Sequence, residues 1–138
     1  MIEDVRKFKQ ILLFASLLLV IAAMIGCGDE NPVNSFNPTV TNVEDTFTFH
    51  ANNAYVVTET YRYSWNNTGQ QASIEQVIAR SGGTVTLVIE DADGNQVYSE
   101  ALAGTENDAT DVGNPGPWRV VVDFKEFSGS VFFRLLAL

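Results

Sequence analysis

Most of the chain after residue 45 alternates between apolar and polar residues, and this alternation restricts the fold more than any other feature. In segment 84–90, for example, Val85, Leu87 and Ile89 alternate with polar residues. A period of two is typical of a β-strand that buries one face. No stretch of 11 residues after Cys27 shows the 3.6-residue period of a helix. The sequence therefore predicts an all-β domain.

Turn residues separate the alternating segments at the spacing of a β-sandwich. The clearest turns are 81–83 and 91–95, which are rich in Gly, Asn and Asp. We predict a single antiparallel β-sandwich of about seven to eight strands over residues 46–138, with 103–117 as a polar loop and a turn at 125–128 that pairs the last two strands. The strands that we can place lie at 46–50, 55–65, 72–79, 84–90, 96–102, 118–124 and 129–135.

The first 26 residues are of a different kind, and we expect them to lie outside this domain. Arg6, Lys7 and Lys9 precede an apolar run of 15 residues, 11–25. About 20 apolar residues are needed for a helix to cross a bilayer, so the run is short for a permanent anchor and suits a secretion signal. We predict a helical signal peptide at 1–26, with an uncleaved anchor or a buried N-terminal helix as the alternatives.

The apolar run ends in Met24-Ile25-Gly26-Cys27, which resembles the lipobox of bacterial lipoproteins. The resemblance implies cleavage between Gly26 and Cys27, attachment of diacylglycerol to the Cys27 thiol, and an N-acyl chain such as palmitate on its free amine. Two or three chains hold a protein stably in a bilayer, at about 0.8 kcal/mol per buried CH₂. These lipids are the only non-protein groups that we expect to be attached.

Residues 27–45 are expected to be the lipidated cysteine and a flexible tether, because the segment is rich in Asn, Pro and acidic residues and has no apolar period. Gly28, and not Asp, follows Cys27, so the signal that retains lipoproteins in the inner membrane is absent. We therefore expect a cell-envelope protein, anchored in the outer membrane if the cell has two membranes.

The chain from Cys27 onwards is strongly acidic, with five basic and 15 acidic residues. It has no basic patch to neutralise phosphates, so we expect no nucleic-acid partner and no peripheral binding to anionic lipid. The whole chain contains one His and one Cys, which excludes a His/Cys zinc site and a disulfide within the chain.

The second half of the chain resembles the bacterial pre-peptidase C-terminal domain in its pattern of strands and turn glycines. The resemblance rests on GTVTLVI at 83–89, Asp-Gly at 93–94, GPWRVVV at 116–122 and Ser-Gly at 128–129. That family is a small secreted β-sandwich attached to peptidases and other exported enzymes. The resemblance implies a non-catalytic accessory or binding module.

The sequence shows no catalytic motif. His50 is the single imidazole, and it lies on the strand face opposite Phe47 and Phe49, so we expect it to point to solvent. No serine motif accompanies it. The domain is also small for a substrate cleft around paired carboxylates, so we predict that the protein is not an enzyme.

Calcium is the metal that the acidic residues could bind. Asp91, Asp93 and Glu100 match part of a calcium loop, but Ile89 would occupy its first position and has no oxygen to offer. A hairpin turn explains the Asp-Gly pair equally well, and we favour it. The same alternatives, a solvated loop or calcium, apply to three acids of the polar loop: Glu106, Asp108 and Asp111.

Aromatic residues could form a sugar-stacking platform or part of the core. We favour the core for the stripe Tyr55, Val57, Tyr61, Tyr63 and Trp65, because each buried ring removes about 150–250 Å² from water. Trp118 follows Gly-Pro at a strand entrance, so we expect it near the rim and take it as a candidate ligand-binding residue.

Together these features predict a lipid-anchored cell-envelope lipoprotein. Its extracytoplasmic β-sandwich would be a non-catalytic binding or structural module, with an envelope protein or a polysaccharide as the partner. The alternative is a carbohydrate- or calcium-dependent ligand-binding lipoprotein.

Overall fold

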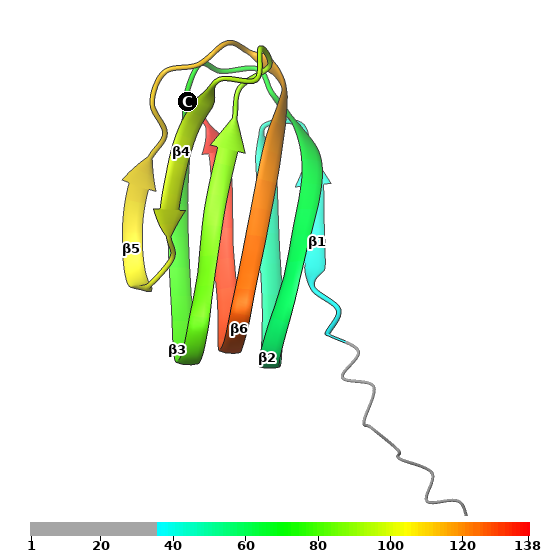
Figure 1. Cartoon of the computed structure of the whole chain (residues 1–138). Helices are drawn as coiled ribbons and strands as arrows, with labels where there is room; N and C mark the ends of the chain where they lie inside the picture. The colour runs from blue at the N-terminus through cyan, green and yellow to red at the C-terminus, as the bar shows by residue number, and fades with distance from the viewer. Residues whose placement is uncertain (1–35) are drawn as a thin grey trace, which may run out of the picture. The chain divides into compact units, whose positions relative to one another are not determined.

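Three strands of 19 to 22 residues organise residues 36–138, the part of the chain that this computed structural model describes. The strands in chain order are β1 (Thr39–Val43), β2 (Thr46–Asn67), β3 (Ala72–Glu90), β4 (Gln96–Ala101), β5 (Gly104–Ala109) and β6 (Gly116–Ala137). All pairings are antiparallel, and β6 lies between β2 and β3 (Figure 1). The described part is all-β, as predicted.

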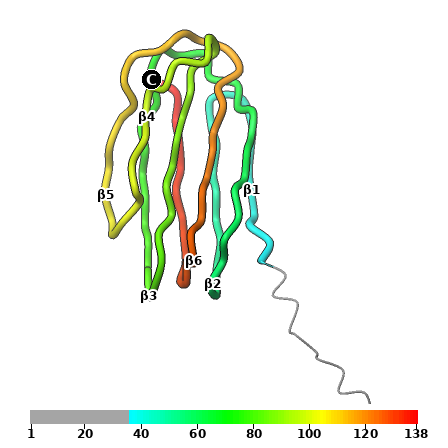
Figure 2. Tube along the Cα trace, in the orientation of Figure 1, coloured from blue at the N-terminus to red at the C-terminus, as the bar shows by residue number. Residues whose placement is uncertain are grey.

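Each long strand doubles back near its middle, so its two halves lie in opposite layers of a β-sandwich (Figure 1, Figure 2). The backbone N–H of Asp45, just before β2, donates to the carbonyl of Asn66 near the end of β2 at 2.9 Å. This contact between the two ends requires β2 to fold back on itself. Shifts in register mark the bends, between Ala51 and Glu59 in β2 and between Arg80 and Thr84 in β3.

The bends correct the predicted connection between the last two strands. We predicted that 118–124 and 129–135 pair with each other across a hairpin turn. Both segments instead belong to β6, and each half of β6 pairs with β2 on one side and β3 on the other. Glu126 and Gly129 have positive φ angles of 48° and 138° in this bend, so the backbone turns between layers and not between neighbouring strands.

Two further strands lie where we predicted none. β1 falls in the predicted tether, where it pairs with residues 46–50 of β2. The side-chain amide of Asn42 also donates to the Ser64 carbonyl at 2.8 Å, which ties β1 to the other layer. β5 falls in the predicted polar loop, where it pairs with β3 although all six of its residues are exposed. Neither strand has the apolar alternation that revealed the others.

The core fills the space between the two layers with alternating residues of the long strands. Phe49 stacks on Phe133 with ring centroids 5.2 Å apart and an interplanar angle of 9°. Trp65 meets Trp118 edge to face at 6.0 Å. Tyr55 departs from the predicted stripe and is 71% exposed, because the bend of β2 interrupts the alternation there.

Residues 1–35 lie outside the described residues, so the predicted signal peptide, its cleavage site at Gly26 and Cys27, and most of the tether are not part of this description. Within residues 36–138, no helix has the length and apolarity needed to span a membrane.

Two glycine variants test the bends. A Cβ at Gly129 would lie 2.0 Å from the Ala79 carbonyl oxygen, whereas a Cβ at Gly94, also at positive φ, would meet nothing within 4 Å. We expect Gly129→Ala to lower the free energy of unfolding by on the order of 3 kcal/mol, and Gly94→Ala by about 1 kcal/mol from backbone strain alone. Urea denaturation of both variants measures this. Equal losses would contradict the close packing of the β6 bend on β3.

Candidate functional site

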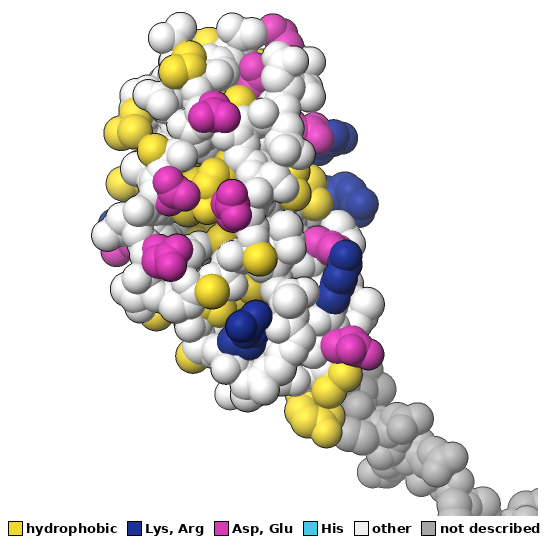
Figure 3. Space-filling model, turned by 60° about the vertical axis from the view of Figure 1, so that its left-hand side comes forward, with side chains coloured by type: hydrophobic (Ala, Val, Ile, Leu, Met, Phe, Trp, Pro, Cys, Tyr) yellow, Lys and Arg dark blue, Asp and Glu magenta, His cyan; other side chains and the backbone are white. Residues whose placement is uncertain are grey.

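The side of the sandwich between β4 and β5 gathers acidic side chains around apolar ones (Figure 3). β4 pairs with residues 86–90 of β3, and β5 pairs with residues 73–78 of the same strand. Because β3 bends between these two segments, β4 and β5 form the edges of opposite layers on one side of the molecule (Figure 1). We call this surface, defined by Gln76, Tyr98, Glu100, Glu106 and Asp108, the acidic edge.

Strand register explains why these acids face the gap between the layers. Directly opposed residues of an antiparallel pair point to the same face. Glu100 lies opposite the core residue Leu87, and Asp108 lies opposite the core residue Ile74. Glu106 is two residues before Asp108 and shares its face. The three carboxylates therefore lie on the same side of the molecule at the edges of the two layers, where all three residues are exposed.

Tyr98 lies among these carboxylates, opposite the core residue Ile89. Burial raises the pKa of its hydroxyl to about 12, with further contributions from the charge of Asp108 and a hydrogen bond with it, and from the charges of Glu100 and Glu106. The hydroxyl therefore stays protonated in neutral solution and acts as a donor at the acidic edge.

Gln76 is the buried polar residue of the acidic edge, with 4% of its surface exposed. Its amide nitrogen donates to the Ala103 carbonyl and to a Glu106 carboxylate oxygen, both at 3.3 Å. Its Oε1 is fully buried and has no hydrogen-bond partner within residues 36–138. A buried acceptor without a donor costs about 1–3 kcal/mol, so Gln76 is not explained by stability alone.

The ion pairs of the described residues leave the acidic edge uncompensated. They join Arg119 to Glu90, Lys125 to Asp123 and Arg134 to Glu75. No basic side chain of residues 36–138 forms an ion pair with an acid of the acidic edge. The acidic edge is therefore a site of concentrated negative charge.

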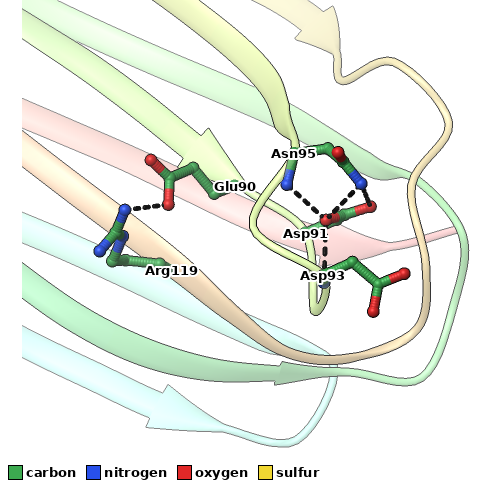
Figure 4. Close-up of polar contacts among 5 residues, drawn as sticks. All are labelled: Glu90, Asp91, Asp93, Asn95 and Arg119. Carbon is green, nitrogen blue, oxygen red and sulfur yellow. Dashed lines mark hydrogen bonds and ion pairs between the residues drawn. The ribbon is translucent and has the colours of Figure 1, made fainter.

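Asp91 has a different role, because it organises the turn between β3 and β4 (Figure 4). Its Oδ1 accepts hydrogen bonds from the backbone N–H groups of Asp93 at 3.0 Å and Asn95 at 2.8 Å. Its Oδ2 accepts from the N–H of Asn114 at 3.0 Å. Burial acts to raise the Asp91 pKa, but the bonds from Asn114, Asn95 and Asp93 outweigh it and lower the pKa.

The structure regroups the acids that we considered as calcium ligands. It does not bring Asp91, Asp93 and Glu100 together, since residues 36–138 contain no group of three or more His, Cys, Asp or Glu side chains arranged to hold a metal ion. Asp111 lies beyond the end of β5, where its backbone N–H donates to the Val97 carbonyl at 2.8 Å. Glu106 and Asp108 lie on β5 itself. Glu100 instead joins the acids of β5.

The aromatic candidates belong to the core. Trp118 is fully buried and its indole N–H donates to the Asn114 carbonyl at 2.7 Å, so the expected position near the rim was wrong. Its Gly-Pro neighbours start a long strand here and do not mark an exposed entrance. Tyr61 and Tyr63 are partly buried against Phe49, as favoured for this stripe.

His50 is exposed, as predicted, and lies beside Phe132 on the outer face. Sequence reasoning missed Gln76, Tyr98 and the way β5 completes the acidic edge. A signal for Gln76 was present, because this amide stands between Ile74 and Ile78 on the buried face of an alternating strand. The position of Tyr98 has no comparable signal in the sequence.

Comparison with known proteins found no protein-family model and no curated protein that matches the chain. Among solved structures, it is similar to TmCBM61 in complex with β-1,4-galactotriose, with 14% identity over 73% of this chain and 70% of that chain and a TM-score of 0.38. It is also similar to a glycoside hydrolase family 43 arabinoxylan arabinofuranohydrolase from Bacillus subtilis in complex with cellotetraose, with 15% identity and a TM-score of 0.28. That match covers 73% of this chain and 20% of the hydrolase. At these values neither likeness assigns a ligand or an activity to this chain.

The role of Asp91 can be tested through pH. At neutral pH we expect Asp91→Asn to lower the melting temperature by several degrees, because an amide cannot accept all the bonds from Asp93, Asn95 and Asn114. A lowered folded-state pKa stabilises the fold above the ordinary value of 3.8, and this stabilisation is lost as pH falls through the folded value. The difference in melting temperature between wild type and Asp91→Asn should therefore narrow below about pH 4.

The matched control is Asp93→Asn, which removes the same charge two residues away. Asp93 accepts one side-chain bond, from the Asn114 amide at 2.5 Å, and an asparagine oxygen can accept it as well. We expect the melting temperature of this variant to be close to that of wild type, both at neutral pH and below about pH 4. Similar effects of the two substitutions would show that Asp91 does not organise the turn.

Proposed function

We propose that this protein is a lipid-anchored cell-envelope lipoprotein whose β-sandwich is a non-catalytic, extracytoplasmic binding module. The observation that carries the proposal is the order of the parts along the chain. A positive N-region, an apolar run and Met24-Ile25-Gly26-Cys27 precede an all-β domain. Lipid on Cys27 would anchor the protein, in the outer membrane if the cell has two membranes.

The distance between anchor and domain fits this arrangement. Phe36 is the ninth residue after Cys27; it is the first described residue and packs on Phe124 with ring centroids 5.2 Å apart. Nine residues span at most about 30 Å when fully extended. The folded domain would therefore start close to the membrane surface, within reach of envelope partners.

A binding role is favoured over a purely structural one by the acidic edge. Its three carboxylates form no ion pair within residues 36–138, and the buried Gln76 Oε1 beside them lacks a donor. A module that served only as a spacer would not require this arrangement. The partner would be an envelope protein or a polysaccharide, and a carbohydrate- or calcium-dependent ligand is the second candidate.

Replacing the lipobox cysteine tests the anchor. We expect Cys27→Ser to leave the protein as an unprocessed precursor or to release it from membranes, because a serine oxygen does not substitute for the thiol that forms the thioether. Membrane fractionation and the mass of the intact protein measure both outcomes. Asn34→Ser is the matched control, since it changes the tether and leaves the lipobox intact. A Cys27→Ser protein that is still processed and membrane-bound would refute the lipoprotein assignment.

A further inference from the structure

We propose that one end of the sandwich, where β2, β3 and β6 bend, rests on the surface of the lipid bilayer, with the exposed side chains of Tyr55 and Val56 in the interfacial region. We call this surface the bend end and define it by residues 52–58, 80–84 and 125–129. The inference rests on the lipid anchor proposed above, since the anchor brings the domain to the membrane. The point where the chain enters the domain, the exposed apolar pair and the distribution of charge each support this contact.

The chain enters the folded domain at the bend end. Phe36, the first described residue, packs on Phe124 just before the bend of β6. β1 then starts at Thr39, opposite His50, which lies just before the bend of β2. The start of the described chain and the bends of the three long strands lie at the same end of the sandwich (Figure 1, Figure 2). A tether from a lipid on Cys27 would therefore arrive at this end.

The length of the tether favours this end over the opposite one. Phe36 is the ninth residue after Cys27, and nine residues span at most about 30 Å. The half of β2 at 59–67 also has nine residues, so its layer is about 30 Å long at roughly 3.3 Å per residue. The opposite end could reach the bilayer only if a fully extended tether lay along the whole layer. The bend end reaches the bilayer with any shorter span.

Tyr55 and Val56 are exposed apolar side chains at the bend end, with 71% and 54% of their surfaces exposed. Tyrosine is enriched where membrane meets water, because its ring is apolar and its hydroxyl stays hydrated. A valine beside it would gain from the removal of its apolar surface from water. The pair therefore has the chemistry of a shallow contact with the bilayer interface.

The backbone at this pair is strained, and the bend does not require the residue found there. Val56 has a φ angle of 49°, which is unfavourable for a β-branched residue. Its backbone N–H donates to the Ser128 hydroxyl at 2.9 Å, and this bond ties the bend of β2 to that of β6. In β6 a glycine, Gly129, adopts positive φ without such strain. The geometry of the bend alone does not explain a valine at residue 56, whereas contact of its side chain with lipid does.

Charge is distributed along the sandwich in a way that fits the same orientation. The bend end has one acid, Glu126, and two basic residues, Arg80 and Lys125. The opposite end consists of the turns at 44–45, 66–71, 91–95 and 110–117. These turns contain no Lys or Arg and five acids, which are Glu44, Asp45, Asp91, Asp93 and Asp111. An anionic membrane surface repels acids and attracts basic residues, so the charges orient an anchored domain with its bend end toward lipid. They are too few to recruit the protein without the anchor.

The experiment measures lipid contact at each end of the full-length lipidated protein, held as single copies in phosphatidylcholine nanodiscs. An environment-sensitive fluorophore is attached to an introduced cysteine, which would be the only free thiol because the lipid occupies Cys27, the single cysteine of the chain. Asn52→Cys places the label at the bend end, and Val112→Cys places it on an exposed residue of the opposite end. We expect a lipid with a doxyl group near its headgroup to quench the label at residue 52 and to leave the label at residue 112 unquenched.

Variants that carry the label at residue 52 test the apolar pair. Val56→Asn removes the apolar side chain and suits positive φ, so we expect it to melt at or above the wild-type temperature while quenching falls by about half or more. Val43→Asn is the matched control, because Val43 is 56% exposed beside the turn of the opposite end, and should leave quenching unchanged. Tyr55→Ser should also reduce quenching, and it provides the test if Val56→Asn does not fold.

Several results would overturn the inference. They are the absence of quenching at residue 52, equal quenching at residues 52 and 112, and equal effects of Val56→Asn and Val43→Asn. A blue-shifted emission at residue 52 without quenching by the doxyl lipid would also overturn it, because protein and not lipid would then cover the bend end. A protein that is held by the membrane through Cys27 and shows no quenching at residue 52 would lose the orientation and keep the lipoprotein assignment. A protein that does not associate with membranes at all would lose both.

Discussion

The folding back of three long strands is the constraint on which the rest of this structure depends. β6 pairs with β2 and β3 along both of its halves, so the three strands must bend at the same level. The bends require backbone that L-residues rarely adopt, and Val56 and Glu126 have φ angles of 49° and 48° there. At Gly129 the chain passes so close to Ala79 that a side chain has no space. One hydrogen-bonded sheet thereby becomes two layers with a single core.

The bends also determine what lies at each side of the sandwich. Because β3 folds over, the two strands that pair with its two halves become neighbouring edges of opposite layers. On the opposite side, Phe36 packs on Tyr61 and Phe124, and β1 is tied to Ser64. Phe36 therefore packs over the β1 side of the core, whereas Glu100, Glu106 and Asp108 lie on the β4 and β5 side. Exposed charge and the buried amide of Gln76 lie together on the β4 and β5 side.

Carboxylates serve two distinct purposes in this domain. Asp91 accepts backbone N–H groups from both the turn and the loop before β6, so its charge is used within the fold. Glu100, Glu106 and Asp108 are exposed and form no ion pair within residues 36–138. The first arrangement explains a lowered pKa and a defined turn, and the second leaves charge available to a ligand. Acidic composition alone does not distinguish them.

Much of the fold could be predicted from the sequence because local periodicity reports burial directly. The alternation around Phe47, Val85 and Val120 and the Asp-Gly turn at 93–94 predicted strands and a hairpin that the structure contains. The resemblance of Met24-Ile25-Gly26-Cys27 to a lipobox also comes from the sequence alone, since it depends on contiguous residue types and not on a fold. β1 and β5 could not be predicted, because their pairing comes from neighbouring strands and not from their own residues.

The acidic edge was decided by tertiary structure. Glu100 and Glu106 are six residues apart and looked like members of separate groups, and Gln76 is distant from both along the chain. They meet because β3 bends and presents its two halves to β4 and β5. Bending depends on backbone contacts between segments about 50 residues apart, such as Ala79 with Gly129. The apolar alternation of the sequence by itself predicted most segments of the three long strands, whereas long-range pairing determined where these strands bend and which side chains lie near one another.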